Sequence, residues 1–279
     1  MADGGKIRAG LARHQGFLAH GGFRWAIIAA VVVAVAITLY ALDNPDPRPN
    51  GGSFYGYTLG TIGALLILWL TALGVRKRAI TPGVWSLKAW TSAHVYLGLA
   101  LIVIGTLHTG FKFGWDVHTL AYALMLVVIV SGMVGVTFYA TLPRLLSDNR
   151  SERTEPQMVI ELRTLDAQLQ EAGQSLDAEA ARRVSRALRE DPFKAGFWRR
   201  LSGMYPLGAT QAARKWFGRQ ADNDRLAGLL DRRAEMLARM RRHMQLRAML
   251  EGWLYVHVPA TFALLAALTA HIVAVFFYW

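Results

Sequence analysis

Five long apolar runs divide the chain of 279 residues, and most of the polar stretches between them are short. The runs cover residues 24–43, 57–75, 87–110, 117–140 and 253–277. Each approaches the roughly 20 residues that an α-helix needs to cross the apolar core of a bilayer. The pattern therefore predicts an all-α membrane protein built as a five-transmembrane-helix bundle. The first run is followed by Asp and Pro residues instead of a small-residue cleavage site, so we expect a retained helix and no signal peptide.

One long polar stretch separates the fourth and fifth runs, and it has a helical periodicity of its own. Apolar residues recur there at the spacing of one helix face, namely Met158, Leu162, Leu165, Leu169, Leu226, Leu230, Leu237, Met240 and Met244. Four regions are expected. They are a basic cytoplasmic N-terminal arm (1–23), transmembrane helices one to four (24–142), a helical cytoplasmic insert (143–251) and the fifth transmembrane helix (252–279).

Basic residues concentrate in alternate polar segments. The N-terminal arm, the second loop and the insert are rich in Lys and Arg, whereas the first and third loops hold only Arg48 and Lys112. Lys and Arg mark the cytoplasmic side of membrane helices. The pattern therefore predicts a cytoplasmic N-terminus and a C-terminus on the outer side of a bacterial-type inner (plasma) membrane. We attribute the net charge of +12 to the excess of Lys and Arg on the cytoplasmic side and to contact with anionic lipid. We expect no nucleic acid partner.

The insert itself carries 21 Lys and Arg against 15 Asp and Glu, and basic residues mix with aromatic ones around Trp198 and Trp216. Segments of this composition bind membrane interfaces, so one interpretation is a helical cap lying on the membrane lipid. The other is a surface that docks an acidic, electron-carrying redox partner protein.

The histidines carry the candidate chemistry, because the chain has no cysteine for thiolate metal sites or covalently attached haem. His94 and His108 lie in the third run and His257 and His271 in the fifth, each pair 14 residues apart. Fourteen residues advance about 1400°, close to four turns, so both rings of a pair share one helix face about 21 Å apart. That separation excludes one shared metal ion and suits two stacked cofactors.

Depth in the bilayer pairs these histidines across the two runs. Both runs cross outward in the predicted orientation, so His94 matches His257 in depth and His108 matches His271. Neutral imidazole is an axial ligand of haem iron, and the arrangement predicts two stacked bis-histidine sites for haem b. Small residues leave room for a flat macrocycle between helices, and Gly98 and Gly105 of the third run are the candidates for that role.

His118 lies at the start of the fourth run, near the predicted outer haem. It is interpreted as a partner of a haem propionate, as a proton-handling group at a quinone site, or as an alternative ligand. An interfacial histidine exposed to lipid headgroups is the remaining interpretation.

The two segments SAHVYLGLALIVIGTLHTGF and VHVPATFALLAALTAHIVAVF contain the paired histidines. This arrangement resembles diheme cytochromes b and, more closely, the membrane domain of the ferric reductase and NADPH oxidase superfamily, whose third and fifth helices carry the haem ligands. The resemblance covers about 57–277 without the insert, and it implies haems that carry electrons across the membrane. That superfamily usually has six helices and a flavin and nicotinamide module, and no G-x-G-x-x-G follows a strand here.

We therefore expect an electron-transfer subunit of a membrane oxidoreductase that exchanges electrons with quinone or a protein partner. Two alternatives stay open. One is a stand-alone reductase of a metal ion or oxygen at the outer haem. The other is a haem-free structural or assembly protein in which the histidines only pack.

Overall fold

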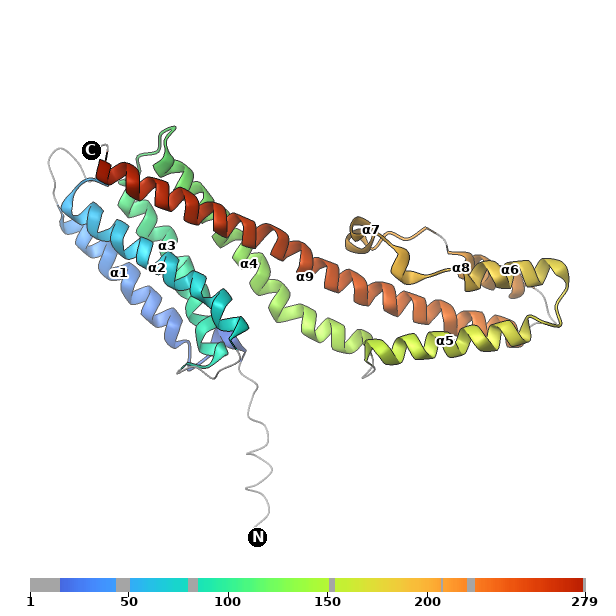
Figure 1. Ribbon diagram of the computed structural model, residues 1–279. Coiled ribbons are helices and arrows are strands. Elements are labelled where there is room, and N and C mark those ends of the chain that lie inside the picture. The colour runs from blue at the N-terminus through green and yellow to red at the C-terminus, as the bar shows by residue number, and fades with distance from the viewer. Residues whose placement is uncertain are drawn as a thin grey trace, which may run out of the picture. The chain divides into compact units, whose positions relative to one another are not determined.

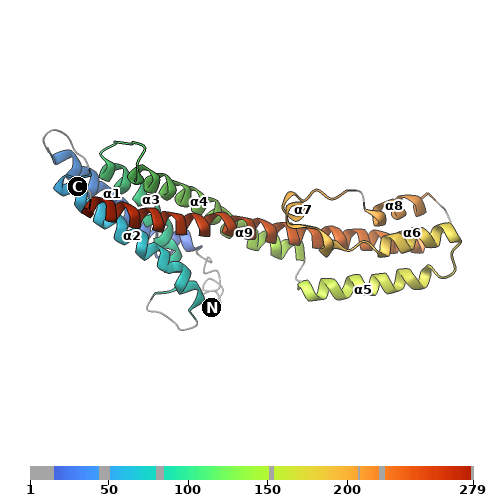
Figure 2. The same cartoon turned by 45° about the horizontal axis from the view of Figure 1, so that its top comes forward.

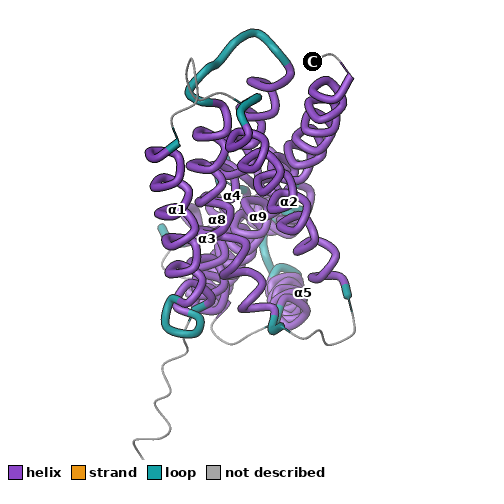
Figure 3. The backbone as a smooth tube through the Cα atoms, turned by 90° about the vertical axis from the view of Figure 1, so that its left-hand side faces the viewer, coloured by secondary structure: helices purple, strands orange, loops and turns teal. Residues whose placement is uncertain are grey.

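The structure is a computed structural model that describes residues 16–43, 51–79, 85–150, 154–206, 208–219 and 224–277, without the side chains of 142–150. Every regular element in these ranges is a helix (Figure 3). Five helices are long and apolar enough to cross a membrane: α1 (Arg24–Leu42), α2 (Phe54–Arg78), α3 (Leu87–Thr109), α4 (Val117–Arg150) and α9 (Asp224–Phe277). The predicted all-α class and its five candidate spans are confirmed, and they mark an integral membrane protein. The direction of crossing and the kind of membrane stay predictions.

Shorter helices complete the described chain. They are η1 (Phe17–Ala19), α5 (Glu155–Ala172), α6 (Ala178–Leu188), η2 (Pro192–Lys194), α7 (Phe197–Ser202) and α8 (Ala209–Phe217). The chain forms two compact units, one of 1–136 with 256–279 and one of 137–255. The second unit contains the predicted insert together with the ends of α4 and α9 that lead into and out of it.

In the first unit, α3 packs closely against α1 and α2 (Figure 1). Ala93 and Ala100 of α3 are almost completely buried, and small side chains such as these let helix backbones approach each other. Apolar side chains on the other helix faces are exposed, among them Val31, Leu65 and Val130. Such faces suit contact with lipid, where every backbone polar group is satisfied within its own helix.

Serine side chains begin α2 and α3. Ser53 Oγ accepts a hydrogen bond of 3.0 Å from the N–H of Gly56, and Ser86 Oγ accepts one of 3.2 Å from the N–H of Ala89. These bonds satisfy N–H groups that the first turn of a helix leaves without an intrahelical partner. At its other end, α3 stops at Gly110, whose φ of 57° lies in the left-handed region that glycine adopts easily.

The second unit has a hydrophobic core in which α5, α6 and α8 pack around the first part of α9 (Figure 2). All nine residues of the two predicted apolar stripes, on α5 and α9, are buried. The stripe prediction is therefore confirmed. His243 lies in a basic stretch of α9, yet it is only 8% exposed, because it lies on the face of the helix that also buries Met240 and Met244.

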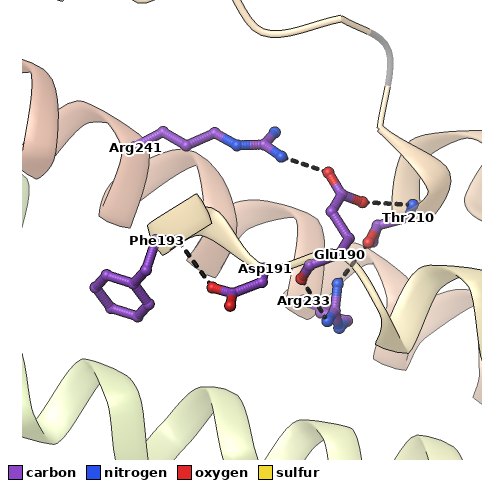
Figure 4. A network of polar contacts seen from close by, with 6 residues as sticks. All are labelled: Glu190, Asp191, Phe193, Thr210, Arg233 and Arg241. Carbon is purple, nitrogen blue, oxygen red and sulfur yellow. Dashed lines mark hydrogen bonds and ion pairs between the residues drawn. The ribbon is translucent and has the colours of Figure 1, made fainter. Parts of the chain in front are cut away.

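A fully buried arginine, Arg233, connects three segments of this unit, and Figure 4 shows it beside two of its partners, Glu190 and Thr210. Arg233 of α9 donates to Asp166 Oδ1 at 2.7 Å, to Thr210 Oγ1 at 2.6 Å and to the carbonyl oxygen of Glu190 at 3.3 Å. A buried guanidinium is unfavourable unless it is paired and hydrogen-bonded. The network therefore specifies how α5, α8 and the turn at Glu190 pack on α9.

The Glu190 carboxylate is the second centre of the same network. It accepts a hydrogen bond of 2.8 Å from the N–H of Thr210 and pairs with Arg241. Burial alone raises the pKa of this carboxyl, but the hydrogen bonds from Thr210 and the charge of Arg241 outweigh burial and lower the pKa. Glu190 is thus held in its charged form.

Candidate histidine site

Both histidines of α3 donate a hydrogen bond to the backbone of α2. His94 Nδ1 lies 3.0 Å from the carbonyl oxygen of Leu70, and His108 Nδ1 lies 2.7 Å from that of Gly56. A carbonyl oxygen only accepts, so Nδ1 carries the hydrogen in both rings. Each Nε2 is left with its lone pair, as a metal ligand requires. Hydrogen bonds of this kind orient metal-ligating histidines and make them more basic.

The ring of His108 lies directly against α2. A Cβ atom placed on Gly60 would lie 2.6 Å from His108 Cε1, closer than real contacts allow. Glycine at this position therefore lets the imidazole approach the helix and reach the carbonyl oxygen of Gly56. Sequence reasoning missed Gly56, Gly60 and Leu70. The signal available for the glycines was their spacing of four residues, which marks close approach between membrane helices.

A second hydrogen-bond chain lies at His257, which with His94 makes up the level predicted to be the inner one. Ser131 Oγ donates to the carbonyl oxygen of Val128 at 2.9 Å and lies 2.9 Å from His257 Nδ1. Because the hydroxyl donates its hydrogen to Val128, it accepts one from His257 Nδ1. Both rings of this predicted pair thus present Nε2 as their available ligand atom.

The outer level brings together three imidazoles, one each from α3, the start of α4 and α9. Ring centroids are 6.0 Å apart for His108 and His271, 5.2 Å for His108 and His118, and 4.8 Å for His118 and His271. One nitrogen from each ring lies within 4.8 Å of the others. His118 therefore lies beside the predicted outer pair, at a distance suited to metal ligation.

The spacing of the helices is compatible with a flat group between α3 and α9. In the described part of the first unit, α3 makes its extensive backbone contacts with η1, α1 and α2, and not with α9. A metal–imidazole bond is about 2 Å long, so two imidazoles on opposite sides of one iron have centroids roughly 6 Å apart. The 6.0 Å between the His108 and His271 centroids fits that requirement. The ring of His118 lies 5.2 Å and 4.8 Å from these two centroids and occupies space between them that the plane of a haem would need, so a haem at this level requires His118 to turn away.

The two glycines predicted to make room for a macrocycle have different surroundings. A Cβ on Gly98 would meet no described atom within 4 Å, so space is open beside this residue. A Cβ on Gly105 would lie 2.8 Å from Met125 Cε and 3.5 Å from Tyr122 Cδ2. Gly105 thus packs against α4, where the end of the flexible Met125 side chain contacts it. A role for either glycine in cofactor binding stays a prediction.

Asp116 precedes α4 in an exposed loop. Its Oδ1 accepts a hydrogen bond of 2.8 Å from the N–H of Thr119, which lowers the pKa of the carboxyl, and the imidazoles of His118 and His271 add to this effect. The carboxylate thus caps the start of α4 and adds negative charge close to the outer imidazoles.

The structure therefore brings His108 and His271 together, and His118 joins them, whereas the pairing of His94 with His257 stays a prediction. Hydrogen bonds from Nδ1 hold three of these five rings. No protein-family model, curated protein or solved structure matches the chain.

Proposed function

We propose that the chain is a b-type cytochrome that carries electrons across the membrane. His94 and His257 would hold one haem b, and His108 and His271 would hold a second. The observation that carries the proposal is the pair of hydrogen bonds from Nδ1 of His94 and His108 to carbonyl oxygens of α2. They hold both rings in the tautomer that offers Nε2 to a metal. When bound, haem iron supplies reversible one-electron oxidation and reduction.

Residues around the histidines hold the imidazole rings in position. Leu70, Gly56 and Ser131 accept hydrogen from the imidazoles and hold each ring in one orientation. A fixed ligand needs less rearrangement when the charge on the metal changes. The two levels lie about 21 Å apart along α3, which is most of the roughly 30 Å apolar core of a bilayer.

An electron carrier of this kind needs a donor and an acceptor. We propose that the chain is the membrane subunit of an oxidoreductase complex that exchanges electrons with quinone or with a protein partner. The proposal agrees with the resemblance to diheme membrane cytochromes, which covers the histidine-bearing segments.

An absorption spectrum tests this function. The protein purified from haem-replete cells should show low-spin b-type bands and about two haems per chain. Reduction of these haems by a quinol, without any flavoprotein, is expected if quinone is the donor. A colourless preparation would refute the proposal and favour the haem-free structural alternative.

A second candidate function is reduction of a metal ion or of oxygen at the outer level. The third imidazole of His118 favours it, because a bis-histidine haem uses only two imidazoles and leaves one to contact a substrate. The variant His118→Ala should then keep both haems and lose electron transfer to ferric or cupric ions. If the variant instead loses the outer haem, His118 is an axial ligand.

A further inference from the structure

A cluster of aromatic side chains surrounds the point where α9 becomes continuously apolar. Phe197 of α7 packs edge-on against Tyr255, with ring centroids 6.1 Å apart, and Trp253 packs edge-on against Tyr139 at 5.8 Å. A Cβ on Gly252 would lie 3.4 Å from Phe197 Cζ. Aromatic residues gather where membrane helices meet the headgroups, and these contacts pack α7 against that part of α9.

The segment around α7 exposes apolar side chains. Trp198 is 78% exposed, Met204 is 75% exposed and Phe193 is 40% exposed. Arg200 Nη2 donates a hydrogen bond of 2.6 Å to the carbonyl oxygen of Phe193, which joins η2 to α7. The three side chains therefore belong to one structured segment, residues 192–204, which we name the α7 segment.

The α7 segment is also basic. It contains Lys194, Arg199 and Arg200 and no acidic residue. Of the two acids that precede it, Asp191 accepts a hydrogen bond of 2.8 Å from the N–H of Phe193 at the start of the segment, and Glu190 pairs with Arg241 outside it. Exposed Lys194 and Arg199 thus add positive charge beside the exposed apolar side chains.

We propose that the α7 segment is a membrane-surface anchor that binds anionic lipid headgroups. Trp198, Met204 and Phe193 enter the headgroup region, and Lys194 and Arg199 contact lipid phosphates. Tryptophan beside basic residues is typical of segments that lie in an interface, and anionic lipid attracts Lys and Arg next to a membrane helix. Contact with the start of the apolar part of α9 favours the bilayer over a protein partner. The anchor is independent of haem binding.

Spin labelling of the full chain tests the anchor, and the absence of cysteine makes single labels straightforward. Met204→Cys places a nitroxide in the α7 segment. Ser175→Cys is the matched control, because Ser175 is exposed in the turn after α5 and lies outside the α7 segment. Each labelled protein is reconstituted in phosphatidylcholine vesicles with and without phosphatidylglycerol. Collision of the label with oxygen, which enters lipid, is compared with collision with a water-soluble nickel complex.

The ratio of oxygen to nickel collisions should be several-fold higher at 204 than at 175, and phosphatidylglycerol should raise it further at 204 only. The double substitution Lys194→Gln with Arg199→Gln should remove the response to phosphatidylglycerol. Equal ratios at the two positions would overturn the anchor. A label at 204 shielded from both reagents would also overturn it, since that result shows cover by protein. Trp198→Cys provides a second label in the same segment.

Discussion

His94 Nδ1 lies 3.0 Å from the carbonyl oxygen of Leu70, and the same relationship recurs 14 residues along α3 between His108 and Gly56. The carbonyl groups are themselves 14 residues apart, in reverse order, because α2 and α3 run antiparallel. One helix therefore supplies the hydrogen-bond acceptors for both levels of the site. Helix α2 carries no candidate ligand, yet it sets the tautomer and the orientation of two.

Gly60→Ala should disturb the outer haem and leave the inner one intact. The added Cβ would lie 2.6 Å from His108 Cε1, so the imidazole must move away from α2 and give up its bond to Gly56. We expect a changed low-spin electron paramagnetic resonance signal and a lower occupancy for one haem only. Gly74→Ala is the matched control on α2, because a Cβ there meets no described atom within 4 Å. Identical spectra for the two variants would contradict this role of Gly60.

The proposed pairing of the histidines predicts which two single substitutions remove the same haem. His94→Ala and His257→Ala should each remove the same haem, and the double variant should lose no more than either single variant, since both residues serve one metal. His94→Ala combined with His271→Ala should remove both haems. Haem content by the pyridine haemochrome assay, with redox titration to identify the haem that remains, measures this. Loss of both haems in the double variant of His94 and His257 would show that the pairing is wrong.

Ser131→Ala should weaken the inner haem by removing the acceptor for His257 Nδ1. Loss of a partner that orients a metal-ligating histidine reduces metal affinity by about 10–100-fold. The expected results are partial loss of one haem and a shifted midpoint potential of the remaining inner haem. Ser131→Thr keeps the hydroxyl and should behave like the unaltered protein. If alanine and threonine give the same potential and occupancy, the hydrogen bond has no role in holding the ligand.

Glu190→Gln should destabilise the insert at neutral pH and have no effect on it in acid. The folded protein lowers the pKa of Glu190, so the charged carboxylate stabilises the fold above the ordinary Glu pKa, and this contribution is lost as the pH falls through the lowered value. Loss of a charged hydrogen-bonding partner costs roughly 2 kcal/mol. Hydrogen exchange of α6 and α8, measured by mass spectrometry, should be faster in the variant at neutral pH. A difference that persists unchanged at acidic pH would rule out this explanation.

The periodicity of apolar residues was sufficient to predict the five candidate spans and the buried stripes of the insert. Met158, Leu162 and Leu165 recur at the helical period because one face of α5 is buried, and burial selects residue type directly. Helical geometry likewise placed His94 and His108 on one face of α3. These features depend on a single helix and its surroundings, so a linear pattern contains them.

Contacts between helices were decided only by the tertiary structure. The acceptors for His94 and His108 are backbone carbonyl groups, which every residue type has. The identities of Leu70 and Gly56 therefore do not reveal this role. The sequence placed His118 near the outer pair and left its role open, but its convergence with both rings depends on the turn between α3 and α4, which periodicity does not describe. The burial of Arg233 was also not predictable from the sequence, because a charged side chain is expected to be exposed. Its complete burial is possible because partners from three other segments accept its hydrogen bonds. A pattern along one helix records which face is apolar, and the path of the chain decides which groups that face meets.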